Sequence, residues 1–132
     1  MKQTLEDDQY CFVCGEKNPA GLHLRFVLHN GKVSAEFTLQ KVHQGYKDIV
    51  HGGIISTILD ETMVKAALMQ GMAAVTAEMT VRFRTPLFAG ERAVSEAAIL
   101  KYNRKVIEAI AVIKRPDESV IAESTGKLLR QD

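Results

Sequence analysis

The sequence predicts an α+β domain in which an antiparallel sheet of about five or six strands packs against one long helix. Three observations predict it. Apolar and polar residues alternate in several strand-length segments, short turn signals separate those segments, and one long apolar stretch has helical spacing. Short turns favour antiparallel pairing, because parallel strands need long crossover connections. The predicted order is two strands, one helix and four strands.

Two strands are predicted before the helix. Residues 23–29 form the first, and the turn signal "HNGK" follows it. In residues 32–39, apolar side chains occupy every second position, with the period of a half-buried strand.

The helix is predicted from about Gly53 to Gln70, with Gly71 as its C-terminal cap. On a helical wheel one broad face is apolar, and Asp60 points away from its centre among mostly small residues. Glu61 lies four residues before Lys65, a spacing that favours an ion pair by about 0.2–0.5 kcal/mol. An ionised carboxylate in so apolar a helix needs either a partner or a function. Glu61 has a structural explanation and Asp60 lacks one, so Asp60 is the candidate functional residue.

Four strands are predicted after the helix. Residues 76–84 alternate strictly, and residues 93–100, 106–113 and 119–129 are further strands joined by short turns. Such spacing is typical of an antiparallel meander.

Composition limits the classes of function. The 132 residues fit a single domain spanning residues 1–132, and the net charge of +1 gives no indication of nucleic acid or an anionic membrane as partner. Residues 1–10 lack the apolar core of a signal peptide, and no segment is apolar enough for a membrane helix. We therefore expect a cytoplasmic protein. The two cysteines cannot form a disulfide framework.

The spacing Cys11-x-x-Cys14 raises the question of a metal site. His23 and His29 would complete a Cys-Cys-His-His set, but a strand over residues 23–29 would hold them about 20 Å apart. A redox role would require a helix starting at the cysteine pair, and "GEKNPAG" follows instead. We therefore expect no metal ion and a structural role for both cysteines.

The start of the helix offers chemistry that complements Asp60. His51-Gly52-Gly53 precedes the first turn, where free backbone amides and the positive end of the helix dipole could hold an oxyanion. Asp60 lies about 12 Å further along the axis, too far to act on the same carbon. Two copies with antiparallel helices would bring Asp60 of one beside Gly52 of the other, which predicts a symmetric dimer. The alternative is that the two glycines only form a flexible turn.

The segments "CFVCGEKNPAGLHLRF", "HQGYKDIVHGGIISTILDET" and "AVTAEMTVRFRTPLFAGE" together resemble hotdog-fold acyl-CoA thioesterases of the PaaI-like group. The resemblance covers nearly the whole chain. It implies a sheet wrapped around one central helix, residues 1–22 as an N-terminal flap, and active sites shared across a homodimer that assembles further into a homotetramer. It also implies an acyl-CoA substrate and no cofactor.

The resemblance assigns roles to four residues. The Gly52 amide would polarise the thioester carbonyl, and Asp60 of the partner subunit would act as general base or as nucleophile. Thr76 would orient the attacking water. His51 would support the turn and its hydrogen bonds rather than transfer protons.

One position departs from the family pattern. Relatives often carry Asn or Gln six residues before the histidine, where this chain has Gly45. Gln44 is adjacent but would point elsewhere in an extended segment. Asn18, in the flap, is the candidate substitute, although turn propensity alone favours a turn residue there.

Further residues are expected to bind substrate. The Gly53 amide could donate a second hydrogen bond to the thioester oxygen, beside that of the Gly52 amide. For the coenzyme A phosphates the candidates are Arg82 and Arg84, which share one face of their strand, while Lys101 and Arg104 could assist from a neighbouring turn. An ordinary solvated strand face is the competing interpretation.

Hydrolysis of acyl-CoA to a free acid and coenzyme A is therefore the predicted function. A non-catalytic acyl-CoA binding or sensing protein on the same fold is the alternative; it would usually carry a DNA-binding segment, for which the ten residues before Cys11 leave no room. A hotdog dehydratase would need a different Asp/His pair, which the sequence lacks.

Overall fold

The computed structural model describes residues 4–132, so the first three residues of the predicted flap lie outside the described part. The predicted order of two strands, one helix and four strands is confirmed, with a short 3-10 helix added before the long helix. The elements are β1 (Val27–His29), β2 (Lys32–Thr38), η1 (Lys41–His43), α1 (Gly52–Leu68), β3 (Ala74–Phe83), β4 (Arg92–Tyr102), β5 (Val106–Lys114) and β6 (Val120–Arg130).

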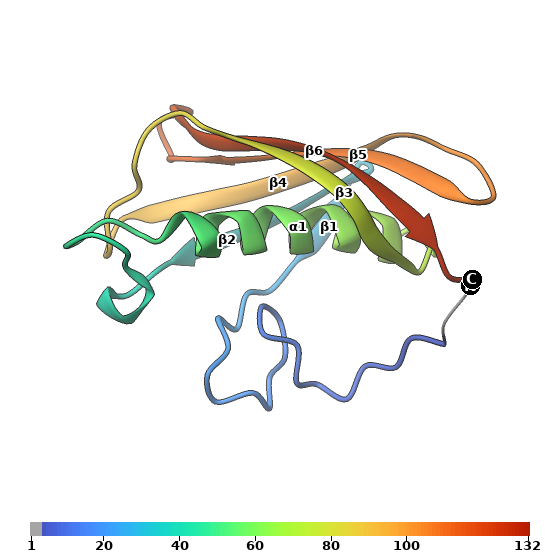
Figure 1. Cartoon of the computed structure of the whole chain (residues 1–132), viewed down its shortest axis with the longest axis horizontal. Helices are drawn as coiled ribbons and strands as arrows, with labels where there is room; N and C mark the ends of the chain where they lie inside the picture. Colours follow the sequence, from blue (N-terminus) through green and yellow to red (C-terminus); the bar gives the residue numbers. More distant parts are fainter. Residues whose placement is uncertain (1–3) are drawn as a thin grey trace.

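The six strands form one antiparallel sheet in the order β1-β2-β4-β5-β6-β3. Strands β4, β5 and β6 are the predicted meander, and β3 lies at the edge beside β6. The sheet curves along one side of α1, as Figure 1 shows. This is the hotdog arrangement, and the predicted fold class is confirmed.

The helix fills the concave face of the sheet because one side of it is almost entirely apolar. Ile58, Leu59 and Met63 are fully buried, and Met63 packs against Gly126 of β6, where a Cβ atom would lie 2.9 Å from the Met63 methyl carbon. The buried Thr62 hydroxyl donates to the Ile58 carbonyl oxygen at 2.6 Å and lies 2.6 Å from the Ser95 hydroxyl of β4. The helix is thereby held in a fixed position relative to the sheet.

The predicted start of the first strand and the predicted end of the helix are wrong, and the other predicted boundaries differ by at most two residues. The first strand begins at Val27 rather than at residue 23, because His23 has a left-handed φ of 56° and the Leu24 amide donates to the Val13 carbonyl of the flap at 2.9 Å. The helix ends at Leu68 with Met69 as its C-cap. Gly71, with φ 87°, lies beyond the cap in the turn that leads to β3.

The flap crosses α1 on the side away from the sheet (Figure 1). Its Val13 side chain is buried in the core, and its Cys11 thiol lies 3.4 Å from the Glu61 carboxylate of the helix. The helix is therefore enclosed by the sheet on one side and by the flap on the other. Within residues 4–132, no helix has the length and apolar character needed to cross a membrane.

Candidate active site

At the start of α1, one backbone amide has no partner in the part of the chain that the structure describes. His51 is the N-cap residue, and its Nδ1 atom accepts a hydrogen bond from the Gly53 amide at 2.8 Å. The His51 carbonyl oxygen accepts from the Ile54 amide at 2.9 Å. No acceptor is found for the Gly52 amide among residues 4–132. Gly52 is therefore the free donor at the positive end of the helix dipole, whereas the Gly53 amide, also expected to bind substrate, is occupied by His51.

The Gly52 amide lies beside an apolar pocket of about 590 Å³. Phe83, at the end of β3, lies so close that a Cβ atom on Gly52 would be 3.5 Å from its ring. The pocket also borders Tyr46 and Ile49 from the segment before the helix and Pro86 from the β3–β4 loop. An apolar acyl group would fit such a wall next to a hydrogen-bond donor.

Asp60 of α1 and Thr76 of β3 are in direct contact. Asp60 is half-buried on α1, and its carboxylate accepts a hydrogen bond from the Thr76 hydroxyl at the start of β3. A β-bulge between Thr76 and Glu78 makes this contact possible, because it breaks the strict alternation of β3. Thr76 thus faces the helix together with Met79 and Val81, the inward residues beyond the bulge.

Asp60 and Gly52 lie eight residues apart on the same helix, hence about 12 Å apart along its axis. A single chain therefore does not place the Asp60 carboxylate and the Gly52 amide at the same reacting carbon atom. The strand that contacts Asp60, β3, is an edge strand, with no neighbour on its outer side among residues 4–132. An unpaired edge is a template for pairing with a second chain.

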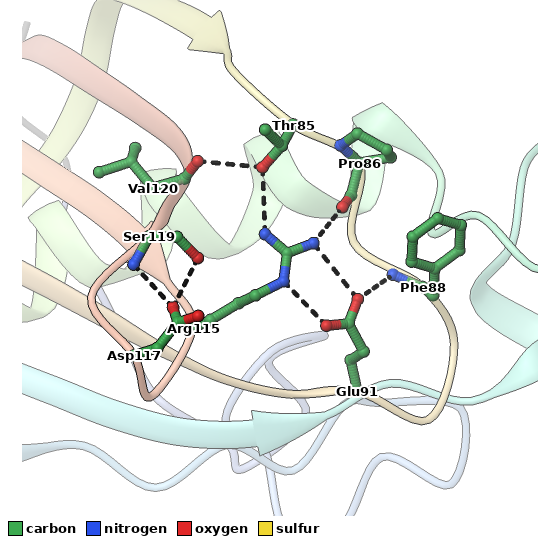
Figure 2. Close-up of polar contacts among 8 residues, drawn as sticks. All are labelled: Thr85, Pro86, Phe88, Glu91, Arg115, Asp117, Ser119 and Val120. Atoms are coloured by element: carbon green, nitrogen blue, oxygen red, sulfur yellow. Dashed lines mark hydrogen bonds and ion pairs between the residues drawn. The ribbon is translucent and has the colours of Figure 1, made fainter.

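Arg115 fixes the loop that forms one wall of the pocket (Figure 2). Its guanidinium donates to both oxygens of Glu91, at 2.8 and 3.3 Å, and to the Pro86 carbonyl oxygen at 2.5 Å. It also donates to the Thr85 hydroxyl at 3.1 Å. The hydrogen bonds from Arg115 lower the pKa of Glu91. Glu91 also accepts a hydrogen bond from the Phe88 amide at 3.0 Å. The sequence analysis missed this residue, because the partners lie 24 to 30 positions from Arg115.

The β3–β4 loop also forms hydrogen bonds with residues 48–50, the segment that leads into α1. The Val50 amide donates to the Leu87 carbonyl oxygen at 2.8 Å, and the Ala89 amide donates to the Asp48 carbonyl oxygen at 2.9 Å. These bonds continue the path from Arg115 to the residue just before His51. Arg115 therefore positions the start of α1 without touching it.

Asn18, the candidate substitute for the missing Asn or Gln, is engaged elsewhere, and so is Gln44, which was expected to point away. The Asn18 amide nitrogen donates to the Tyr10 carbonyl oxygen at 3.1 Å, and its side-chain oxygen accepts from the Ala20 amide at 2.9 Å. Asn18 thus organises the flap. The Gln44 side chain accepts from the Asp48 amide at 2.9 Å, and a Cβ atom on Gly45 would lie 3.4 Å from the His51 ring. Position 45 is beside His51, but it carries no polar group.

The predicted basic residues do not all border one pocket. Arg84 borders the Gly52 pocket and is paired with Glu123 at 2.5 Å. Arg82 lies in a different hollow, which is also lined by Ala97 and Ile110 of the sheet. Lys101 is paired with Glu108 of β5 at 3.4 Å, and Arg104 is exposed in the β4–β5 turn. Of these residues only Arg84 borders the pocket beside Gly52.

The predicted pair between Glu61 and Lys65 is confirmed, with 3.9 Å between carboxylate and ammonium. Glu61 points toward the flap, whereas its neighbour Asp60 contacts β3. The two adjacent acids therefore belong to different parts of the molecule.

Comparison with known proteins gives a consistent result. Residues 47–122, more than half of the chain, match the family model described as the thioesterase superfamily. Human acyl-coenzyme A thioesterase 13 is 28% identical over 103 residues, which are 76% of this chain and 69% of that protein.

Three solved structures share the fold. A thioesterase superfamily protein aligns with a TM-score of 0.86 at 24% identity over 92% of this chain, which spans only 60% of that longer one. The PaaI protein of the phenylacetic acid degradation operon of E. coli aligns with a TM-score of 0.77 at 23% identity over 83% of this chain and 80% of its own. A Streptococcus mutans protein bound to acetyl CoA aligns with a TM-score of 0.76 at 17% identity over 81% of this chain and 87% of its own.

Proposed function

Because the chain belongs to the thioesterase superfamily, we propose that it hydrolyses acyl-CoA thioesters to a free acid and coenzyme A, at two equivalent sites of a homodimer. One observation carries the proposal. The Gly52 amide is the free donor at the start of a helix that holds a half-buried aspartate eight residues further on, beside an unpaired sheet edge. The names of the human and Streptococcus relatives support acyl-CoA as the substrate.

The reaction uses residues of both subunits. The thioester carbonyl oxygen accepts from the Gly52 amide of one subunit, and this bond strengthens as negative charge develops on the oxygen. Asp60 of the other subunit takes a proton from water, whose oxygen forms the new bond to the carbonyl carbon. The carbon–sulfur bond then breaks, and the coenzyme A thiolate leaves and takes up a proton. Direct attack by the Asp60 carboxylate is the second possible route.

Thr76 and His51 act as positioning residues in this scheme. The Thr76 hydroxyl holds one oxygen of Asp60, which leaves the other oxygen for water. His51 fixes the first turn by accepting a hydrogen bond from the Gly53 amide, which leaves the Gly52 amide to face the substrate. The two contacts hold the base and the oxyanion donor in defined orientations.

Substrate binding divides into an apolar and a charged part. The acyl group would occupy the pocket beside Phe83, Ile49 and Pro86. Arg82 and Arg84 remain the candidates for the coenzyme A phosphates, with Arg84 favoured because it borders the same pocket. Asn18 would act indirectly, by shaping the flap.

The homodimer would form along β3. Pairing of two β3 edges by a two-fold axis joins the two sheets, sets the helices antiparallel and brings Asp60 of one chain toward Gly52 of the other. Val75 and Phe83 are exposed apolar residues on this strand, as expected for a surface that a second copy covers. A homotetramer would use the exposed apolar residues of β4 and β5, such as Leu100 and Ile110.

The experiment that tests the function is release of free thiol from a panel of acyl-CoAs, with Asp60→Asn as the catalytic variant and Glu36→Gln, at an exposed position of β2 away from β3, as the control. The proposal predicts turnover by wild type and by Glu36→Gln, and binding without turnover by Asp60→Asn. Binding of acyl-CoA without thiol release by the wild type would instead support the alternative, a non-catalytic acyl-CoA binding or sensing protein.

A further inference from the structure

Two thiols and one carboxylate gather where the flap crosses the helix, outside the candidate active site. One ligand atom each from Cys11, Cys14 and Glu61 lies within 4.8 Å of the other two. The Cys11 sulfur is 3.4 Å from the Glu61 oxygen. A sulfur and an oxygen bound to one tetrahedral zinc ion, at about 2.3 and 2.0 Å from it, lie roughly 3.5 Å apart. The spacing therefore already matches that of two ligands of one ion.

The backbone of the flap holds both sulfurs on the same side of a tight turn. The Gly15 amide donates to the Cys11 carbonyl oxygen at 2.9 Å, and the Val13 amide donates to the Cys11 sulfur at 3.4 Å. A Cβ atom on Gly15 would lie 2.4 Å from the Cys11 nitrogen, so only glycine fits after the second cysteine. Cysteines with two residues between them in such a turn are a common pair of zinc ligands, and amide donors to sulfur are typical supporting contacts.

The charges around the cluster can balance those of a zinc site. Zinc binds cysteine as the thiolate, and a bound metal ion deprotonates a coordinating thiol outright. Two thiolates and one carboxylate on a divalent ion leave one excess negative charge. Lys65, whose ammonium is 3.9 Å from Glu61, supplies the balancing positive charge.

We propose that Cys11, Cys14 and Glu61 bind one zinc ion, which fastens the flap to α1. Soft thiolate ligands and a tetrahedral set favour zinc among the common divalent ions. The hollow beside Cys14 and Lys65 gives room for a water molecule as the fourth ligand. This inference replaces the sequence-based expectation of no metal, which weighed His23 and His29 as partners. The His23 ring donates instead to the Asn18 carbonyl oxygen at 2.7 Å.

The position of the ion suggests its effect. Glu61 is adjacent to Asp60, and the flap contacts the helix at Glu61. A zinc ion at this point would hold the flap in place next to the catalytic turn of the helix without touching the substrate. Its role is structural, so the proposal stands independently of the thioesterase chemistry.

Titration of chelator-treated, reduced protein with zinc and with cobalt(II) tests the proposal. We expect one ion per chain and the strong visible absorption of cobalt in a tetrahedral site with thiolate ligands. Loss of a supporting contact alone weakens metal binding about 10–100-fold. Cys14→Ser and Glu61→Gln, which remove a ligand, should weaken it at least as much, whereas Glu78→Gln should bind as the wild type does.

A second measurement separates loss of the ligand from loss of the fold. Zinc should raise the melting temperature of the wild type and protect both cysteines from alkylation. At a zinc concentration that just saturates the wild type, it should do neither in Glu61→Gln, which keeps both thiols and the shape of the side chain. Absence of stoichiometric zinc binding in the wild type would overturn the proposal. Equal affinity of the wild type and Glu61→Gln would overturn it as well.

Discussion

The Thr76 hydroxyl, on the third residue of the edge strand β3, donates a hydrogen bond to the carboxylate of Asp60 in the middle of the central helix. This contact fixes the acid at the unpaired edge of the sheet. The other half of the candidate chemistry, the Gly52 amide, is about 12 Å away along the same helix. The predictions below follow from this separation.

Replacing Asp60 with Asn should reduce turnover by at least about 10²-fold, as expected when a general base is removed. The amide keeps the size of the side chain and can still accept from Thr76, so the fold should persist. Steady-state thiol release and circular dichroism measure the two effects. Undiminished turnover in a folded Asp60→Asn variant would contradict the assignment.

Thr76→Val should reduce kcat by roughly 10-fold, because the base loses the contact that orients it. Valine keeps the β-branched shape that suits a strand. Thr76→Ser restores the hydroxyl and should recover most of the activity. Equal kcat values for the Val and Ser variants would show that the hydroxyl has no part in the reaction.

Gly52→Pro removes the proposed oxyanion donor with little other change. Proline is well tolerated at the first position of a helix, and His51, with φ −60° and ψ 132°, already has the extended conformation that precedes proline. We expect kcat to fall about 10²–10³-fold, the usual cost of losing one oxyanion donor. Gly52→Ala is the matched control. It keeps the amide and places a Cβ atom at ordinary contact distance, 3.5 Å, from Phe83.

Arg115→Lys should destabilise the protein by about 1 kcal/mol, because lysine cannot replace the forked contacts to Glu91 and Pro86. Chemical unfolding at neutral pH measures this loss. If the anchored loop also positions the helix start, KM should rise in the same variant. An unchanged unfolding free energy would contradict the anchoring role.

The Arg115 contact also predicts a pH dependence. It lowers the pKa of Glu91 in the folded state, so the ionised carboxylate stabilises the fold above the ordinary glutamate pKa of 4.5, and this stabilisation is lost as the pH falls through the lowered value. Glu91→Gln should therefore be less stable than the wild type near neutral pH, and the difference should shrink in acid. A difference that is independent of pH would argue against the ion pair.

The sequence predicts the fold and singles out Asp60 as a candidate residue, for identifiable reasons. Alternation and turn signals locate the strands, and helical spacing separates Asp60 from Glu61 and Lys65, because these patterns are local. The contact between Thr76 and Asp60 depends on a β-bulge, which strict alternation hides. The engagement of the Gly53 amide depends on the rotamer of His51.

Other contacts cannot be predicted from local sequence patterns. Cys11 meets Glu61 across 50 positions, and Arg115 meets Glu91 across 24. No local periodicity links such pairs, so only the folded chain reveals them. The cluster of Cys11, Cys14 and Glu61 and the anchored loop are therefore seen only in the structure.

Subunit complementation tests the central claim, that each active site combines Asp60 of one chain with Gly52 of its twin. Asp60→Asn and Gly52→Pro are each expected to be nearly inactive alone. Coexpressed with statistical pairing, half of the dimers are mixed and each has one intact site, so about a quarter of the wild-type activity should return. Activity of the mixture no higher than that of the two single variants would contradict a site shared between subunits.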